Sequence, residues 1–218
     1  MRIGLIRVMT LEDESLLNIH GKLIEECFDD VTVISRCIED QPEGIHDEKT
    51  EREAIPKIIK LGSQFKNIDA LIVSCCADPG VKELRRRLRI PVIGSGSSAT
   101  AVALSYGDKI GVLSLKEPPK VIVDILGNRI VGVVAPRGVR TALDLMNPEI
   151  RKEVLKSAKE LAKTGAEVIL PACSGFSTFR LCQEIEKKTG IITVDPVIAS
   201  GLMALYGNLT KRDLKKCT

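Results

Sequence analysis

Two apolar runs in this chain end in cysteine: ALIVSC at residues 70–75 and VILPAC at residues 168–173. Each is followed by small or turn-forming residues, a helical pattern and a further apolar run, at residues 91–94 after the first and 191–194 after the second. Continuous apolar runs of this length predict strands that are covered on both faces of a parallel sheet. The two runs therefore predict an α/β fold in which one arrangement occurs twice.

The same alternation of strand and helix continues along the whole chain. We expect strands near residues 3–8, 31–35, 69–75, 90–94, 109–115, 129–135, 166–172 and 191–195. One helix is predicted over 13–28, with Leu16, His20, Ile24 and Cys27 on a single face. Another is predicted over 148–164, with Asn147 as its cap, Pro148 at its first position, a stripe of Ile150, Val154, Ala158 and Leu161, and Gly165 at its end. Strands alternating with helices predict parallel sheets with right-handed crossovers.

The chain also carries an internal duplication. RIGLI at residues 2–6 parallels KIGVL at residues 109–113, and a cysteine run, a helix and a strand follow each of them in the same order. We expect two pseudo-symmetric lobes, each a parallel sheet flanked by helices, with the active site in the cleft between them. The first lobe would span residues 1–96, completed by a C-terminal helix within 197–218, and the second would span residues 97–196.

Composition narrows the class of protein. The 218 residues carry a net charge of +3 and only 3% aromatic residues, so there is little on which nucleic-acid bases would stack. No stretch resembles a signal peptide or a membrane span. The seven cysteines are an odd number, which favours reduced thiols and a cytoplasmic location. These features predict a cytoplasmic protein that binds neither nucleic acid nor membrane.

Both cysteine runs end where ligands bind in parallel α/β folds, beyond the carboxyl ends of strands. After Cys75, Asp78 is predicted to cap the next helix, with Pro79 at its first position. After Cys173, Ser174 and Gly175 lead directly into a helix. A helix N-terminus stabilises a thiolate and also attracts a small anion. Of the other cysteines, Cys76 is expected to be structural, and packing or surface roles are expected for Cys27, Cys37, Cys182 and Cys217.

The residues around both cysteines resemble those of a known family. The segment DALIVSCCADPG at residues 69–80, followed by PVIG at 91–94, is similar to the first active-site segment of the aspartate/glutamate/hydantoin racemase superfamily, and the Cys-x-x-Asp-Pro-Gly form is most similar to its hydantoin racemase branch. ACSGF at residues 172–176 resembles the second active-site segment. PEGI at residues 42–45 resembles a loop of the same branch.

This resemblance implies cofactor-independent racemisation or epimerisation of a small carboxylate or a hydantoin-like compound. Cys75 and Cys173 match the two catalytic positions, where one thiolate removes a proton and the opposite thiol returns one through an enolate-like intermediate. The substrate-binding set that we expect around them comprises Cys76, Ala77, Ser174, Gly175, Gly96 and Ser97. The resemblance and base rates also imply a homo-oligomer.

Several residues depart from the family pattern or add little to it. Residues 7–10, RVMT, stand where the family has its loop after the first strand. Within them Arg7 is a candidate partner for a substrate carboxylate, and Ser114 is a similar candidate at the end of the second lobe's first strand. His20 is expected to be a satisfied core residue, and His46 to be solvated in a polar loop. Two separated histidines do not form a metal site. Residues 94–98 open a helix but lack a nucleotide-binding pattern.

Other readings of the sequence remain open. A maleate-type cis–trans isomerase of the same fold would use one cysteine as a nucleophile. A malonate decarboxylase would need only one of the two cysteines. A non-catalytic small-molecule binding module is permitted by the departures at residues 7–10 and 76–77, and a thiol-redox protein is a further alternative.

Overall fold

The structure is a computed structural model that describes the backbone of residues 1–214 and the side chains of residues 1–207. Its contacts divide the chain into two compact units. Unit 1 comprises residues 1–74, 78–94 and the chain from Val197 onward, and unit 2 comprises residues 75–77 and 95–196. Each unit contains one parallel four-stranded sheet flanked by helices, which confirms the predicted fold class. Cys217 lies outside the described residues.

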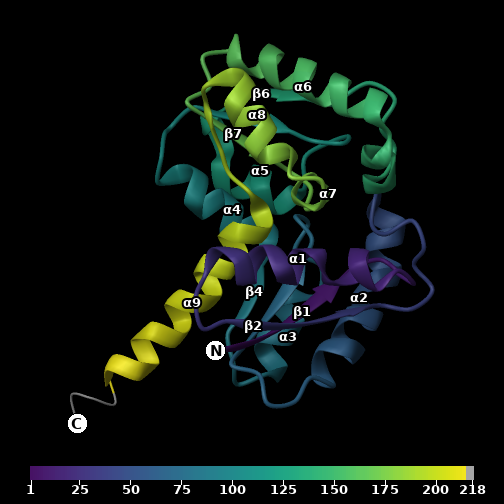
Figure 1. Ribbon diagram of the computed structural model, residues 1–218, viewed down its shortest axis with the longest axis vertical. Helices are drawn as coiled ribbons and strands as arrows, with labels where there is room; N and C mark the ends of the chain where they lie inside the picture. The colour runs from purple at the N-terminus through teal and green to yellow at the C-terminus, as the bar shows by residue number, and fades with distance from the viewer. Residues whose placement is uncertain (215–218) are drawn as a thin grey trace. The chain divides into compact units, whose positions relative to one another are not determined.

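Unit 1 alternates strands and helices throughout (Figure 1). Its elements are β1 (Arg2–Arg7), α1 (Glu14–Cys27), β2 (Thr32–Cys37), α2 (Glu48–Ser63), β3 (Ala70–Ser74), α3 (Val81–Arg87), β4 (Val92–Gly94) and α9 (Pro196–Leu214), of which Pro196 belongs to unit 2. The sheet has the order β2-β1-β3-β4, and all of its pairings are parallel.

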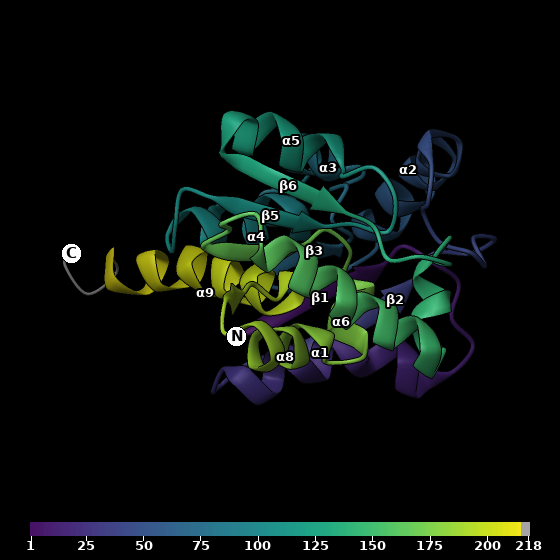
Figure 2. The same ribbon diagram turned by 90° about the horizontal axis from the view of Figure 1, so that it is seen from above.

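Unit 2 repeats this topology. Its elements are α4 (Ser95–Leu104), β5 (Ile110–Leu113), α5 (Lys120–Leu126), β6 (Ile130–Val134), α6 (Pro148–Ala162), β7 (Val168–Pro171), α7 (Gly175–Thr178), α8 (Leu181–Thr189) and β8 (Ile192–Thr193), with 3-10 turns at Gly127–Arg129 (η1) and Ala142–Met146 (η2). The sheet order β6-β5-β7-β8 matches the order of unit 1 strand for strand. Figure 2 shows β5 and β6 running side by side beneath α5. The internal duplication predicted from the sequence is therefore present in the topology.

Burial explains why the strand predictions succeeded. Every residue of β3, β5 and β7 is buried, as expected for central strands that have helices on both faces. Helix α6 begins as predicted, since the side chain of Asn147 accepts the amide of Glu149 at 2.9 Å and Pro148 is the first helical residue. Val154, Ala158 and Leu161 are fully buried on its inner face. Eight expected strands correspond to eight observed ones, each within a few residues of the predicted bounds.

Some local predictions were wrong. Asp78 does not cap α3, because the chain turns through positive φ at Asp78 and Gly80 and the helix begins only at Val81. The single helix expected after Cys173 is broken at Arg180, which has φ of 53°, into α7 and α8. Cys27 is exposed, because Leu23 rather than Cys27 completes the buried face of α1.

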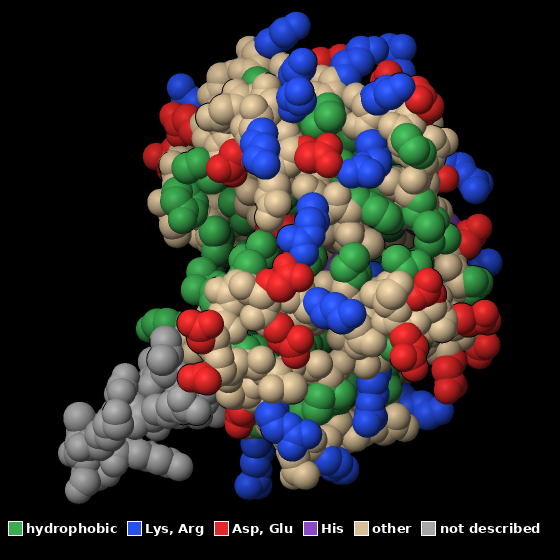
Figure 3. All heavy atoms as spheres, in the orientation of Figure 1, with side chains coloured by type: hydrophobic (Ala, Val, Ile, Leu, Met, Phe, Trp, Pro, Cys, Tyr) green, Lys and Arg blue, Asp and Glu red, His purple; other side chains and the backbone are tan. Residues whose placement is uncertain are grey.

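Helix α9 packs onto α1 within unit 1. Val197 and Ala204 share a buried cluster with Leu23 and Ile24 of α1. A Cβ at Gly201 would lie 3.0 Å from Ile24, so the glycine permits this close approach of the two helices. No helix of the described part of the chain is long and apolar enough to span a membrane. Basic and acidic side chains are interspersed on the face drawn in Figure 3.

Candidate active site

The strand registers place the two cysteines at equivalent positions. In unit 1, Ile3 of β1 pairs with Ala70 of β3, and Cys75 follows five residues after Ala70. In unit 2, Ile110 of β5 pairs with Val168 of β7, and Cys173 follows five residues after Val168. The two cysteines therefore occupy equivalent positions just beyond the carboxyl ends of two central strands. This is the edge at which open parallel sheets bind ligands. Both cysteine side chains are partly buried.

The backbone after β7 brings a hydrogen-bond donor to the sulfur of Cys173. The amide of Gly175 donates a hydrogen bond to Sγ of Cys173 at 3.3 Å. A Cβ at Gly175 would lie 2.9 Å from the Cβ of Ala142 in η2, so the close packing of η2 requires glycine here. A hydrogen bond donated to sulfur favours the thiolate over the thiol.

A carboxylate lies at the same corner, on the neighbouring strand. Asp195 follows β8, and its Oδ1 accepts the hydroxyl of Ser177 in α7 at 2.7 Å. Ser177 has no exposed surface, whereas Asp195 is partly buried. The buried thiol of Cys182 also hydrogen-bonds to Asp195. Burial raises the pKa of Cys182 well above its usual range, with further increases from the charge of Asp195 and from Cys173. Asp195 therefore acts electrostatically on the thiol of Cys182.

The corner after β3 has a different polar environment. Ser74, the residue before Cys75, has its Oγ 2.8 Å from Nδ1 of His20, and both side chains are almost fully buried. His20 is thus the satisfied core histidine that the sequence predicted. Cys76 is only 2% exposed, in agreement with its expected structural role. Ala77, which follows it, is partly buried.

Arg7 and Ser114 occupy equivalent ends of β1 and β5. Arg7 is the register partner of Ser74, and Ser114 is the next residue after Leu113, the partner of Pro171. Arg7 is 5% exposed, and one guanidinium nitrogen donates to the backbone carbonyls of Leu16 and Leu17 in α1. Ser114 is 2% exposed and donates to the carbonyl of Glu117 at 3.2 Å. The corner after β3 therefore contains a buried cation where the corner after β7 has a neutral hydroxyl.

A second carboxylate lies next to Gly94, the last residue of β4. A Cβ at Gly94 would lie only 2.2 Å from Cγ of Asp78, so the Asp78 carboxyl fills the space that any other side chain at position 94 would need. Gly96 and Ser97, predicted to bind the substrate, lie in the first turn of α4, which directly follows Gly94. Gly96 is buried and Ser97 partly buried.

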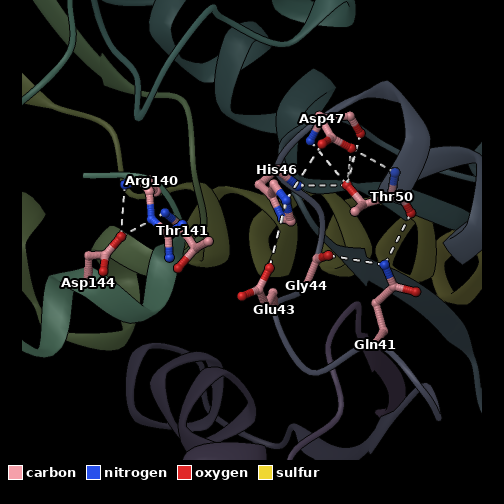
Figure 4. Close-up of polar contacts among 9 residues, drawn as sticks. All are labelled: Gln41, Glu43, Gly44, His46, Asp47, Thr50, Arg140, Thr141 and Asp144. Carbon is pink, nitrogen blue, oxygen red and sulfur yellow. Dashed lines mark hydrogen bonds and ion pairs between the residues drawn. The ribbon is translucent and has the colours of Figure 1, made fainter. Parts of the chain in front are cut away.

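The loop that joins β2 to α2 lies at the same edge of the unit 1 sheet (Figure 4). Nε2 of the buried Gln41 donates to the carbonyls of Gly44 and Thr50 at 3.1 and 3.2 Å, and Asp47 and Thr50 form the capping box of α2. The ring of His46 is only 18% exposed, with Nε2 3.6 Å from the Asp47 carboxylate. The prediction of a solvated His46 was therefore wrong, since most of the ring is shielded from solvent.

A pseudo-equivalent loop of unit 2 joins β6 to α6. Figure 4 shows Asp144 accepting the backbone amides of Arg140 and Thr141, at 2.8 and 2.9 Å. These two hydrogen bonds lower the pKa of the Asp144 carboxyl, with a smaller contribution from the charge of Arg140. Thr141 and Asp144 form a capping box, which begins the η2 turn that packs on Gly175. Among the described residues, no group of three or more His, Cys, Asp or Glu side chains could hold a metal ion.

Comparison with known proteins now identifies the family. The model of the Asp/Glu/Hydantoin racemase family matches residues 21–202, which include both cysteine corners. The chain belongs to this family. The resemblance read from its sequence is thereby confirmed, and the protein is an enzyme of the isomerase class.

The chain is also similar to individual proteins that are named as racemases. The chain is 30% identical over 176 residues to a hydantoin racemase of Rhizobium meliloti, covering 76% of this chain and 71% of that protein. It is 28% identical over 167 residues to a hydantoin racemase of Pseudomonas sp. (strain NS671), covering 72% of this chain and 65% of that protein. The crystal structure of an allantoin racemase from Pseudomonas fluorescens has the same fold, with a TM-score of 0.82, 21% identity and coverage of 94% and 90% of the two chains.

Sequence reasoning missed one polar residue of the Cys173 corner. Asp195 was not among the predicted site residues, although it directly follows an apolar strand at the edge that carries Cys173. The signal was present in VDP at residues 194–196, an acid immediately after a strand and before a helix-initiating proline. The contacts of Asp195 with Ser177 and Cys182 depend on the break between α7 and α8, which the sequence did not indicate.

Proposed function

We propose that this protein is a cofactor-independent racemase or epimerase in which Cys75 and Cys173 transfer protons on opposite faces of one carbon. The observation that carries the proposal is the equivalent position of the two cysteines at the ends of β3 and β7. In one direction, the thiolate of Cys75 takes the proton from the stereocentre and the thiol of Cys173 supplies one to the other face; the reverse direction exchanges these roles. This chemistry requires both sulfurs to reach one substrate atom.

The substrate that we favour is a neutral cyclic amide of the hydantoin type. Removing the proton next to its ring carbonyl produces an enolate-like anion, which needs hydrogen-bond donors at the carbonyl oxygen. The names of the curated relatives support this class. The carboxylate of Asp195 supports it independently, because a negative charge at the Cys173 corner, where Ser114 stands at the position equivalent to the cation Arg7, disfavours a substrate that is itself an anion. A free amino acid is the alternative that the same assay tests.

The remaining site residues have proposed roles in binding. We assign the enolate oxygen and ring carbonyls to backbone amides and small side chains at Cys76, Ala77, Ser174, Gly175, Gly96 and Ser97. Ser114 and Arg7 are proposed to act at the ends of β5 and β1. Since one guanidinium nitrogen of Arg7 bonds to the backbone of α1, its contribution would be a fixed positive charge and not a mobile clamp.

Deuterium exchange tests the reaction directly. The protein is incubated in deuterated water with single enantiomers of 5-monosubstituted hydantoins and of amino acids, and deuterium at the stereocentre is followed by mass spectrometry. We expect exchange and loss of optical rotation with a hydantoin, reduced by roughly a thousandfold or more in Cys75→Ala and in Cys173→Ala. Cys37→Ala, at a partly buried thiol on the edge strand β2, is the matched control and should retain the activity.

The outcomes separate this function from its rivals. Exchange that survives both single substitutions would contradict the two-thiol mechanism. Binding of a hydantoin without any exchange would indicate a binding module, and conversion of maleate to fumarate would indicate the cis–trans isomerase. Exchange with amino acids alone would move the substrate to the carboxylate class.

Two further proposals concern the setting of the enzyme. Acid–base chemistry by thiols needs a reducing compartment, which supports a cytoplasmic location. A homo-oligomer is proposed from the family resemblance and from base rates, and its test is the mass measured by light scattering during size-exclusion chromatography.

A further inference from the structure

The carboxylate of Asp195 occupies a position that the other half of the fold also fills with a carboxylate. Leu71 pairs with Val92 in unit 1, and Ile169 pairs with Thr193 in unit 2. Gly94 follows Val92 by two residues and Asp195 follows Thr193 by two residues, so Gly94 and Asp195 are equivalent. At Gly94 the place of the missing side chain is taken by the carboxyl of Asp78. The same place beside each cysteine thus holds a carboxylate, supplied from two unrelated points of the chain.

Asp195 lies close to Cys173 through the register and through shared contacts. If the β7–β8 register is extended, Asp195 lies beside Pro171, with the two backbones about 5 Å apart. Pro171 is two residues before Cys173. Ser177, whose hydroxyl binds Asp195, belongs to the α7 turn that begins two residues after Cys173. Cys173 also packs against the buried cluster that contains Cys182, which Asp195 contacts.

The two corners differ in what balances this negative charge. At the corner after β3, the buried guanidinium of Arg7 lies at the end of β1, whereas the equivalent position in unit 2 is Ser114. Other charged groups lie on elements packed around the Cys173 corner. Arg151 pairs with Glu184 at 2.9 Å, and Glu186 accepts the amide of Thr193. Asp144 accepts the amides of Arg140 and Thr141, and the side chain of Arg180, between α7 and α8, is exposed.

We propose that Asp195 is a positioning residue that holds Cys173 in its thiol form in the resting enzyme, so that Cys173 is the proton donor in the direction in which Cys75 removes the substrate proton. The negative charge of Asp195, which raises the pKa of the neighbouring Cys182, opposes the effect of the hydrogen bond that the amide of Gly175 donates to Cys173 at 3.3 Å. This inference rests on the proposed two-thiol function for its role in the reaction. In that reaction the substrate proton goes to Cys75 and the Cys173 proton goes to the opposite face, which leaves Cys173 as the thiolate.

The test titrates one thiol in the absence of substrate. Cleavage after Lys163 and Arg180 gives a peptide, residues 164–180, in which Cys173 is the only cysteine. The rate of its labelling by iodoacetamide is measured against pH in the intact protein before digestion. In the unsubstituted protein, we expect the midpoint for Cys173 to lie above the value of about 8.5 for an ordinary cysteine. A midpoint below that value would overturn the proposal, and this measurement requires no variant.

Asp195→Asn removes the charge but retains an oxygen that accepts from Ser177. We expect its midpoint to fall by about one pH unit, with labelling at pH 7 faster by roughly tenfold. Glu184→Gln removes a carboxylate from α8 and is the matched control, with an unchanged midpoint. Ser177→Ala breaks the hydrogen bond but keeps the charge, so its midpoint should stay above 8.5. An unchanged midpoint in folded Asp195→Asn would contradict the proposal, as would an equal fall in Ser177→Ala.

The reaction and the thiol titration can fail separately. If no hydantoin and no amino acid undergoes exchange, the proposed function is contradicted, but the measured titration of Cys173 remains valid. An unshifted titration together with normal exchange would remove only the role of Asp195. In Asp195→Asn, the pH profile of exchange should move in the same direction as the labelling midpoint, which a purely structural effect on folding would not produce.

Discussion

The two cysteine corners share a backbone plan and differ in almost every polar group around it. Sheet order, strand register and the distance in sequence from register partner to sulfur are the same. Yet the residue before Cys75 is Ser74, which contacts His20, whereas the residue before Cys173 is Ala172. Three residues after Cys75 the chain has Asp78, and at the equivalent position after Cys173 it has the fully buried Phe176. Topology therefore fixes where the sulfurs lie, and the side chains around them set how readily each sulfur holds a proton.

Phe176 gives the largest expected effect on stability, because it anchors α7 beneath Cys173. Its side chain is fully buried among Leu113, Leu145 and Leu181. Phe176→Ala should lower the free energy of unfolding by about 3–5 kcal/mol, through lost burial and the cavity that remains. Chemical denaturation measures this, with Val123→Ala, at a side chain 40% exposed, as the control that should cost less than about 1 kcal/mol. A cost for Phe176→Ala as small as the control's would mean that α7 is not anchored by the core.

Gly94 tests the corresponding carboxylate at the corner after β3. In Gly94→Ala the new methyl group would meet Asp78, and we expect a loss of about 1–3 kcal/mol in the free energy of unfolding. Adding Asp78→Ala should recover most of that loss, so the double-mutant cycle should show a coupling above about 1 kcal/mol. Additive losses would mean that the glycine is required for its backbone and not for the carboxyl packed on it.

Much of this architecture could be predicted from the sequence, because strands such as β3 and β7 are continuous apolar runs, which indicate strands buried on both faces. The equivalence of Cys75 and Cys173 was predictable for the same reason, as was the Asn147 cap of α6. The turn at residues 78–80 was not predictable, since it depends on the approach of Asp78 to Gly94, which lies on another strand. Likewise, the hydrogen bonds from the Gln41 side chain to the backbone carbonyls of Gly44 and Thr50, which shape the loop around His46, have no signature in the sequence. Long-range contacts of this kind leave no periodic pattern.

Ser74 sharpens the contrast with Ala172. Ser74→Ala removes a hydroxyl 2.8 Å from Nδ1 of the buried His20, and we expect a loss of about 1–2 kcal/mol in the free energy of unfolding. Ser105→Ala is the control, because that serine is exposed and its hydroxyl bonds only its own helix at Ala101, at 3.1 Å. Denaturation curves of the two variants compare them directly. An equal and negligible cost for both would show that His20 finds an alternative partner without strain.

The capping box of unit 2 gives the smallest effect, and its sign depends on pH. Two backbone amides hold the pKa of Asp144 below its usual value of 3.8, so the folded protein binds this proton less readily than the unfolded chain does. The stabilisation is therefore present above pH 4 and disappears as the pH falls through the lowered pKa. Since Asp144 is largely solvated, Asp144→Asn should cost no more than about 1 kcal/mol at pH 7 and nearly nothing at pH 2. Urea denaturation at both pH values measures the difference, and Asp124→Asn, at an exposed pair with Lys120, should show no comparable loss at pH 7. A cost that persists at pH 2 would assign the effect to geometry, because the carboxyl is then protonated in both folded and unfolded states.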